Sequence, residues 1–436
     1  MKQPTDFPAN EFAARRARLF EAIGPNAGAL VAGAPALGAY ALFRQTNEFY
    51  YCCAVEVPGA YLLLDGGAQT ATAFVPDPAA LSADNDHGLD AVLPLAALGH
   101  ALKTAAVLYT PHQPAENVFA ARDALVWANA QMANDPWDGQ PSREHHLAGL
   151  LRTRFPRLDV RDLSPVLDNL RLIKSEYEIG RMRRAGKLSA RAVTEAMKRT
   201  RAGLRENDLH AVALYLYQAA GARGEGYRAI LPSGSERIWD IHYFANDGPL
   251  NDGDLVLMDT APDVNYYTSD IGRMWPVNGK YDPVQRELYG FMVAFHEQLL
   301  ARIRPGATAE QVFDEASAVA APLLEQTAFS KPVYEAAARR VLAFKGSLSH
   351  PVGMAVHDVG NYWQGVLRPG MVFTVDPQMW VPEEELYIRV EDTVLVTQTG
   401  VEVLTADAPL DLDRVEVTMR EPSAFDSIVA MEEGEP

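Results

Sequence analysis

The sequence predicts an α/β domain over residues 1–172, followed by an α+β domain over residues 173–436 that contains an internal pseudo-two-fold duplication. Short apolar runs alternate with helical patterns in the first part, which is the order of an α/β fold. In the second part the order helix, helix, strands occurs twice. At 436 residues the chain also exceeds one ordinary core, because a domain holds roughly 150 residues.

The N-terminal domain is expected to open with a helix that Asn10 caps, because Phe12, Leu19 and Ile23 recur at helical spacing. Short apolar runs bounded by turn residues predict four strands, and another helix is expected near residues 118–133. A polar, proline-containing stretch follows, and the domain boundary is placed near Leu172. The four predicted strands lie at residues 29–32, 61–64, 73–75 and 107–110.

Two helix pairs organise the prediction for the C-terminal domain. Ser175 and Glu178 have the form of a capping box that opens a long helix, and a second helix is expected at residues 206–220. Asp282 followed by proline opens the third helix, and Thr308 with Gln311 caps the fourth. Strands are expected after each pair, at residues 227–231, 240–244, 255–260 and 266–271, and then at residues 352–356, 371–375, 387–391 and 393–396.

Composition and charge exclude several classes of protein. The hydrophobic fraction of 48% and the charged fraction of 22% are those of a globular protein. Lys+Arg 39 against Asp+Glu 57 gives a formal charge of −18, which argues against nucleic acid or an anionic membrane as a partner. The longest uncharged apolar run, residues 28–43, contains proline and glycines and is shorter than the ~20 residues of a membrane span.

The N-terminus and the cysteines predict a cytoplasmic protein. Residues 1–6 lack the apolar segment of a signal peptide. The two cysteines, Cys52 and Cys53, are adjacent, so a disulfide between them would be strained. We expect buried, reduced thiols that bind no metal.

One stretch, residues 255–273, carries the first candidate site. Two apolar runs flank a polar middle, which predicts a hairpin, and each run contains one acid, Asp259 or Asp270. With the turn centred between Val264 and Asn265, the two aspartates face each other across the hairpin. Opposed like charges are destabilising, so the pair predicts a bound cation or a shared proton. Two exposed aspartates beside a surface turn are the alternative interpretation.

The second half of this domain supplies further acids and histidines. Asp376 ends one apolar run, and strand alternation places Arg389 and Glu391 on one face with Asp392 on the other. His350 lies among glycines between the halves, where a structural histidine is the alternative to a ligand. Four carboxylates with one imidazole favour a hard ion such as Mn²⁺ over structural zinc. Their negative charge suggests two ions that share an activated water, as in two-metal hydrolases.

Other catalytic patterns are absent from the sequence. It contains no His-Glu-x-x-His, Cys-x-x-Cys, Gly-x-Ser-x-Gly or Walker-type loop. Ser233-Gly234-Ser235 lacks the nucleophile-elbow pattern and is interpreted as a turn.

Taken together, these segments resemble the pita-bread metallopeptidases, specifically the two-domain aminopeptidase P and prolidase branch. The resemblance covers nearly the whole chain and depends on an ordered set of ligands. Its motifs are residues 43–51, 58–60, 174–175, 241–243, 259–273 with Gly279, 350–360, 374–377 and 389–392.

The resemblance implies a pita-bread C-terminal domain that cleaves the bond before proline with a hydroxide bridging two divalent ions. Asp259 would bind one ion, Asp270 and Glu391 would bridge both, and His350 with Asp376 would hold the second. The ions would be Mn²⁺, with Co²⁺, Zn²⁺ or Fe²⁺ as other candidates. The partners would be short proline-containing peptides, and the protein would be a homodimer or homotetramer.

The same resemblance assigns roles to other side chains. His357 would stabilise the oxyanion, and His242 would contact the substrate near the leaving proline. Asp376 would pass a proton to the leaving nitrogen, and Arg389 would orient a carboxylate or the substrate.

The chain departs from the family pattern near the ligands. Asp376 replaces Glu, which withdraws the carboxylate by about 1.5 Å. Gln378 and Gly272 replace the usual Gly and Thr, and Gly346 replaces a histidine. The interval from Asp376 to Glu391 is also short. A creatinase-like hydrolase of a non-peptide C–N bond and a catalytically weakened peptide-binding homologue are therefore the alternatives.

Overall fold

A computed structural model describes residues 7–38, 40, 42–81, 88–117 and 119–426 of the chain. The chain divides into two compact units. The first comprises residues 1–172 together with 357–360, and the second comprises residues 173–356 and 361–436.

A six-stranded sheet forms the centre of the first unit, in the order β4-β3-β2-β1-β5-β6. β1 pairs antiparallel with β2 and parallel with β5, so the sheet is mixed. The apolar runs at 29–32, 61–64, 73–75 and 107–110 all fall in strands, as predicted. The strands are β1 (Gly28–Ala32), β2 (Tyr61–Asp65), β3 (Thr70–Val75), β4 (Ala91–Pro94), β5 (Val107–Thr110) and β6 (Asp159–Asp162).

Helices surround this sheet, and the first of them begins differently from the prediction. α1 starts at Ala9 after Pro8, whose side chain makes no capping bond, so Asn10 lies inside the helix and does not cap it. Proline fixes the extended entry at this position without a side-chain acceptor. The helices are α1 (Ala9–Ile23), α2 (Asn47–Cys53), α3 (Leu98–Ala101), α4 (Arg122–Asn134), α5 (Arg143–Arg154) and α6 (Ser164–Leu172).

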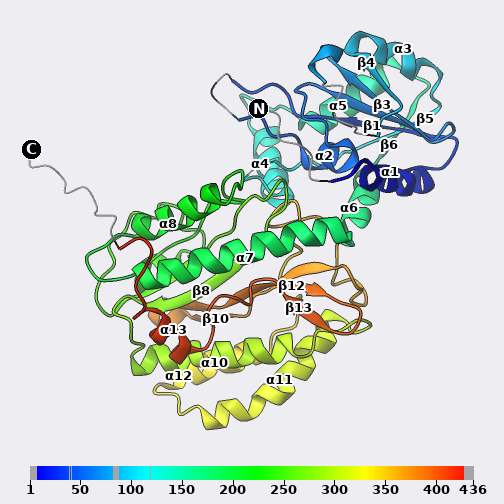
Figure 1. Cartoon of the computed structure of the whole chain (residues 1–436). Helices are drawn as coiled ribbons and strands as arrows, with labels where there is room; N and C mark the ends of the chain where they lie inside the picture. The colour runs from blue at the N-terminus through cyan, green and yellow to red at the C-terminus, as the bar shows by residue number, and fades with distance from the viewer. Residues whose placement is uncertain (1–6, 39, 41, 82–87, 118, 427–436) are drawn as a thin grey trace, which may run out of the picture. The chain divides into compact units, whose positions relative to one another are not determined.

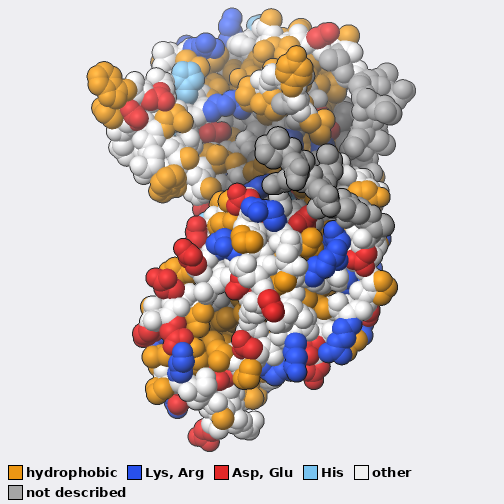
Figure 2. Space-filling model, turned by 90° about the vertical axis from the view of Figure 1, so that its left-hand side faces the viewer, with side chains coloured by type: hydrophobic (Ala, Val, Ile, Leu, Met, Phe, Trp, Pro, Cys, Tyr) orange, Lys and Arg blue, Asp and Glu red, His pale blue; other side chains and the backbone are white. Residues whose placement is uncertain are grey.

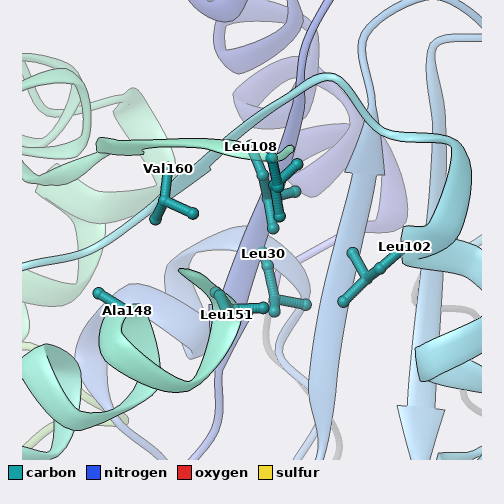
Figure 3. Packing of buried hydrophobic residues seen from close by; sticks show 7 residues of the cluster. Leu30, Leu102, Leu108, Ala148, Leu151 and Val160 are labelled. Carbon is teal, nitrogen blue, oxygen red and sulfur yellow. The ribbon is translucent and has the colours of Figure 1, made fainter. Parts of the chain in front are cut away.

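One part of the core of the first unit lies between the sheet and α5. Leu30 on β1 and Leu108 on β5 pack together, and Leu151 on α5 covers them (Figure 3). Cys52 and Cys53 are buried free thiols, as expected, and burial raises the pKa of Cys53 to about 12. A thiol with so high a pKa is an unreactive core residue.

In the second unit, helices lie on both sides of strands (Figure 1). The predicted capping boxes are present at Ser175 and Thr308, where they begin α7 and α11, and the predicted N-cap Asp282 with proline at N1 begins α10, where Gln285 completes a capping box that was not predicted. The helices are α7 (Glu176–Arg199), α8 (Glu206–Ala219), α9 (Ser235–Trp239), α10 (Pro283–Leu300), α11 (Ala309–Gln326), α12 (Pro332–Leu342) and α13 (Leu412–Thr418).

The main sheet of the second unit is built around β12. Its order is β13-β12-β8-β7, with β9 also paired to β12, and β10 forms a separate hairpin with β11. The strands are β7 (Leu255–Asp259), β8 (Ile271–Pro276), β9 (Val372–Val375), β10 (Gln378–Val381), β11 (Leu386–Arg389), β12 (Glu391–Val396) and β13 (Val401–Val403). β12 therefore connects the strands of both halves of the unit.

Four predicted strands of the second unit are wrong. Residues 240–244 form a turn after α9, and residues 227–231 and 352–356 are irregular, with an isolated bridge at Ile230. The predicted strand 266–271 overlaps β8 only at Ile271, because the hairpin turn and the residues after it occupy 265–270. Residues 227–231 and 352–356 are mostly buried, and burial gives the same apolar pattern as a strand, whereas residues 240–244 are exposed or half-buried. The short α9, α12, β10 and β13 were not predicted.

The surface carries charges of both signs. On the face shown in Figure 2, Lys and Arg side chains are interspersed with Asp and Glu. Among the described residues, no helix is both long and apolar enough to cross a membrane.

Candidate metal centre

The hairpin that carries Asp259 and Asp270 exists, but its register differs from the prediction. β7 pairs with β8 so that Asp259 lies opposite Gly272, and Asp270 precedes β8 by one residue. The turn is centred on Asn265 and Tyr266, whose φ angles are 50° and 74°. Two positive φ angles are characteristic of a tight hairpin turn, and this turn lies one residue beyond the predicted centre.

Tyr227 joins the two aspartates instead. Its hydroxyl oxygen lies 2.5 Å from Asp259 Oδ1 and 2.5 Å from Asp270 Oδ1. A phenol has one proton, so both short contacts are satisfied together when one carboxyl group is protonated. Burial and the nearby Asp270 raise the pKa of Asp259 to about 8, although Arg389 opposes this shift. The two aspartates therefore differ in their affinity for a proton.

A group of three side chains could hold a metal ion. One ligand atom from each of Asp270, His350 and Glu391 lies within 4.8 Å of the others. His350 Nε2 is 3.4 Å from Asp270 Oδ2 and 3.7 Å from Glu391 Oε1. Two ligands about 2.1 Å from one ion at a tetrahedral angle lie about 3.4 Å apart, so this spacing suits a shared divalent ion.

Two further features of Glu391 and His350 make this group suitable for a metal. Glu391 Oε1 is buried and has no hydrogen-bond partner among the described residues, which is costly for a carboxylate unless a cation is nearby. His350 Nδ1 lies 3.3 Å from the Pro351 carbonyl oxygen. A proton on Nδ1 would donate to this carbonyl and leave the lone pair of Nε2 for an ion. The residues present therefore fit a divalent ion.

The electrostatics of these acids depend on burial and on two cationic neighbours. Burial by itself would raise the pKa of Asp270, but the hydrogen bond and charge of His350 outweigh it and lower that pKa. Burial raises the pKa of Glu391 well above its usual range, against the opposing charge of Arg389. A bound divalent cation would favour the ionised form of both groups.

Arg389 lies among the remaining acids. Its Nη1 donates to Asp259 Oδ2 at 3.0 Å, its Nε donates to Asp376 Oδ1 at 3.2 Å, and its Nη2 contacts Glu391 Oε2. Asp376 directly follows β9, and the pairing of β9 with β12 places it opposite Glu391. The structure thus brings Asp259, Asp270, His350, Asp376, Arg389 and Glu391 together.

Asp392 points to the opposite face of β12, as strand alternation predicts. It accepts hydrogen bonds from Arg273 at 2.7 Å and Thr405 at 2.5 Å, and it lies 2.8 Å from His296 Nε2. Burial by itself would raise the pKa of Asp392, but Arg273 and His296 outweigh burial and lower this pKa. This network fixes the strand that carries Glu391.

The two other predicted histidines have partners of their own. His242 is exposed in the turn after α9 and stacks on Phe244 at a centroid distance of 6.0 Å. His357 belongs to the first unit, where its Nδ1 lies 2.7 Å from Asp123 Oδ2. The roles assigned to them stay predictions.

Tyr227 is the site residue that the sequence did not reveal. It lies in a segment predicted as a strand, and a tyrosine in an apolar run is ordinarily a core residue. Its hydroxyl needs a polar partner when buried, which was the available signal. Only the fold shows that the partners of the Tyr227 hydroxyl are Asp259 and Asp270.

Two family models match the chain. The model for metallopeptidase family M24 matches residues 180–398, and the model for the aminopeptidase P N-terminal domain matches residues 12–84. Among curated proteins, the chain is 31% identical over 439 residues to an Xaa-Pro aminopeptidase of Escherichia coli strain K12, covering 95% of this chain and 98% of the relative.

Solved structures give a consistent result. A Bacillus anthracis structure assigned to aminopeptidase P is similar in fold to this chain, with a TM-score of 0.81 at 24% identity. The match covers 96% of this chain and 100% of that one. Aminopeptidase P from E. coli with the inhibitor Pro-Leu gives a TM-score of 0.74 at 29% identity, covering 95% and 99%.

Proposed function

Because the chain belongs to metallopeptidase family M24, we propose that it hydrolyses the peptide bond before proline and releases the N-terminal residue of short peptides. Metallopeptidase activity directed at proline follows from the family and from relatives named Xaa-Pro aminopeptidase that match most of this chain. The predicted fold class and the resemblance to the aminopeptidase P branch are thereby confirmed. The observation that carries the proposal is the convergence of Asp270, His350 and Glu391 around one small volume.

In this proposal, Asp259, Asp270, His350, Asp376 and Glu391 hold divalent ions. When bound, such ions lower the pKa of a coordinated water and polarise a carbonyl. The buried oxygen Oε1 of Glu391 and the spacing of His350 from Asp270 support this assignment. Tyr227 positions the two aspartates by its hydroxyl contacts.

The chain's own residues would handle substrate and proton. Asp376 would carry a proton to the leaving nitrogen, because it is a carboxyl group beside the ligands. His357 would donate to the developing oxyanion, and His242 would contact the substrate near proline. Arg389 would orient a carboxylate. The peptide bond before proline has no N–H, so the enzyme must recognise other groups of the peptide.

Several finer features belong to the same proposal. Oxygen-rich ligands favour Mn²⁺ over softer-site metals. Reduced, buried Cys52 and Cys53 suit a cytoplasmic location. We also propose that the protein is a homodimer or homotetramer. The boundary between its two domains is proposed to lie in the sequence after residue 172.

A hydrolysis panel with metal-depleted protein tests the function. The substrates are Ala-Pro, Ala-Pro-Ala, a longer Ala-Pro peptide and the matched Ala-Ala-Ala, each with and without Mn²⁺. We expect Mn²⁺-dependent release of alanine from Ala-Pro-Ala and from the longer Ala-Pro peptide, and no release from Ala-Pro or Ala-Ala-Ala. Cleavage of Ala-Pro alone would indicate a dipeptidase, and no cleavage with bound metal would favour the creatinase-like or peptide-binding alternatives.

A further inference from the structure

The first unit contains a cavity of about 110 Å³ that the proposed function does not use. It lies at the carboxyl ends of two neighbouring strands, because Val31 and Ala32 end β1, Thr110 ends β5, and all three line the cavity. β1 and β5 run parallel. Open α/β sheets bind ligands in the crevice beyond the carboxyl ends of their parallel strands. The cavity therefore lies where this kind of sheet forms binding sites.

Two residues that line the cavity each have a buried oxygen without a hydrogen-bond partner among the described residues. One is Oε2 of Glu48, which belongs to α2, and the other is Oγ1 of Thr110. Glu48 is 1% exposed and Thr110 is 0% exposed. A buried polar atom that lacks a partner is costly, so both oxygens favour a bound molecule that supplies hydrogen-bond donors.

The arginines beside Glu48 are shared with other acids. Glu48 Oε1 contacts Arg122 and lies 3.7 Å from Arg171 Nη1. Arg122 also lies 3.1 Å from Glu116 and 2.7 Å from Asp168, and Arg171 lies 3.0 Å from Glu116. Burial and the charge of Glu116 raise the pKa of Glu48 well above its usual range, although both arginines oppose this shift. A positively charged donor beside Oε2 would therefore stabilise the ionised form of Glu48.

The cavity also has a positively charged part, at the start of α5. Arg143, the first residue of α5, is exposed and lines the cavity, and its Nη2 donates to the Gly33 carbonyl oxygen at 2.6 Å. This bond fixes the guanidinium at the cavity edge, where the positive end of the α5 dipole adds to its charge. Glu144 lines the cavity too, but its Oε1 already accepts from the Ala115 backbone N–H at 3.4 Å.

Most of the remaining lining is apolar, and the volume is small. Val31, Pro111, Leu147 and Leu150 form part of this lining. A cavity of roughly 150 Å³ holds benzene, so the present one suits a molecule of about four to six non-hydrogen atoms. A buried acid, an apolar wall and an arginine at the exposed edge together match a small molecule with a positive and a negative end.

We propose that the first unit binds a small free amino acid in this cavity, with its ammonium group at Glu48 and Thr110 and its carboxylate at Arg143. The ammonium group donates to Oε2 of Glu48 and to Oγ1 of Thr110, which satisfies both oxygens. The inference goes beyond the proposed function and does not involve the metal ligands. Failure of either proposal therefore leaves the other unaffected.

A ligand-observed NMR titration of the full chain in EDTA tests the proposal without metal or turnover. The probes are glycine, L-alanine, β-alanine and 4-aminobutyrate, a series in which the distance between the two charges increases. We expect at least one of them to bind with a dissociation constant of about 1 mM or lower. Ethylammonium and propionate carry one charge each and should bind at least about tenfold more weakly than the best amino acid. No binding by any of the four amino acids, or equally tight binding of ethylammonium, would overturn the inference.

Three variants test where the amino acid binds. Arg143→Met should weaken amino-acid binding about tenfold and leave that of ethylammonium within about twofold, because only the carboxylate loses a partner. Thr110→Val keeps the shape of the side chain without its hydroxyl and should weaken both ligands about fivefold. Glu48→Gln should weaken both at least about tenfold. The matched control is Glu21→Gln, which changes an exposed acid on α1 and should alter neither constant.

The test stays decisive if Glu48→Gln fails to fold, as circular dichroism would show. Thr110→Val removes an oxygen that has no hydrogen-bond partner among the described residues, and Arg143 is exposed, so both of these variants should fold. Amino-acid binding that neither Thr110→Val nor Arg143→Met weakens would place the ligand elsewhere and overturn the inference.

Discussion

The adjacent residues Glu391 and Asp392 illustrate two uses of buried charge on opposite faces of β12. Asp392 is surrounded by donors from Arg273, His296 and Thr405, and the charge of Arg273 lowers its pKa. Glu391 shares Arg389 with two other acids, has one oxygen without a hydrogen bond, and has a raised pKa because of burial. The face of β12 that carries Asp392 is rich in hydrogen-bond donors and stabilises the fold. The opposite face, which carries Glu391 and lies beside Asp259, Asp270, His350 and Asp376, is poor in donors. On this donor-poor face an added cation would be bound.

The largest expected effect concerns an acid of the donor-poor face. Asp270→Asn removes a proposed bridging ligand and should reduce Mn²⁺-dependent Xaa-Pro hydrolysis by about a thousandfold, or about 4 kcal/mol of transition-state stabilisation. Asp252→Asn changes an exposed aspartate of the same unit and is the control. Steady-state rates at saturating Mn²⁺ measure both variants. Full activity in Asp270→Asn would exclude this site.

Paired isosteric changes at β12 test the comparison directly. Asp392→Asn leaves the buried Arg273 without its ion pair and should lower the free energy of unfolding by about 3–5 kcal/mol. Glu391→Gln relieves repulsion among the acids and should change the stability of the metal-free protein by no more than about 1 kcal/mol. Urea unfolding in EDTA measures both. Equal losses would mean that the two faces do not differ.

Metal binding should stabilise only through the donor-poor face. Mn²⁺ at a hundred times its dissociation constant should raise the free energy of unfolding by about 2.7 kcal/mol. Glu391→Gln should abolish this gain, whereas Asp392→Asn should keep it. Thermal unfolding with and without Mn²⁺ provides the measurement, and Mg²⁺ at equal ionic strength is the control.

The smallest effect is expected at Asp376. Asp376→Glu restores a methylene group and should bring the carboxylate closer to the group of Asp270, His350 and Glu391, tightening Mn²⁺ there about tenfold, or about 1.4 kcal/mol. Equilibrium dialysis with metal analysis measures occupancy. Weaker binding would show instead that the shorter acid is adapted to Arg389 and Gln378, which both donate to it.

The sequence predicted these faces because strand alternation is a local property. The separation of Glu391 from Asp392, the capping boxes, and the strands around Leu30 and Leu108 all followed from spacing. The register of Asp259 could not be predicted, because it depends on the turn at Asn265 and Tyr266, where a tyrosine adopts a positive φ. The contacts of Tyr227 with two aspartates and of Arg389 with Asp259 and Asp376 join distant segments, and no local pattern encodes them.

The five proposed ligands come from five segments of the second unit, from Asp259 to Glu391. An ion can therefore find its full set of partners only after synthesis of the chain has passed residue 391 and β7, β9 and β12 have aligned. Such long-range pairing is slow to form. A nascent or truncated chain would lack the site altogether, so metal uptake would report the last stage of folding and could not guide the first.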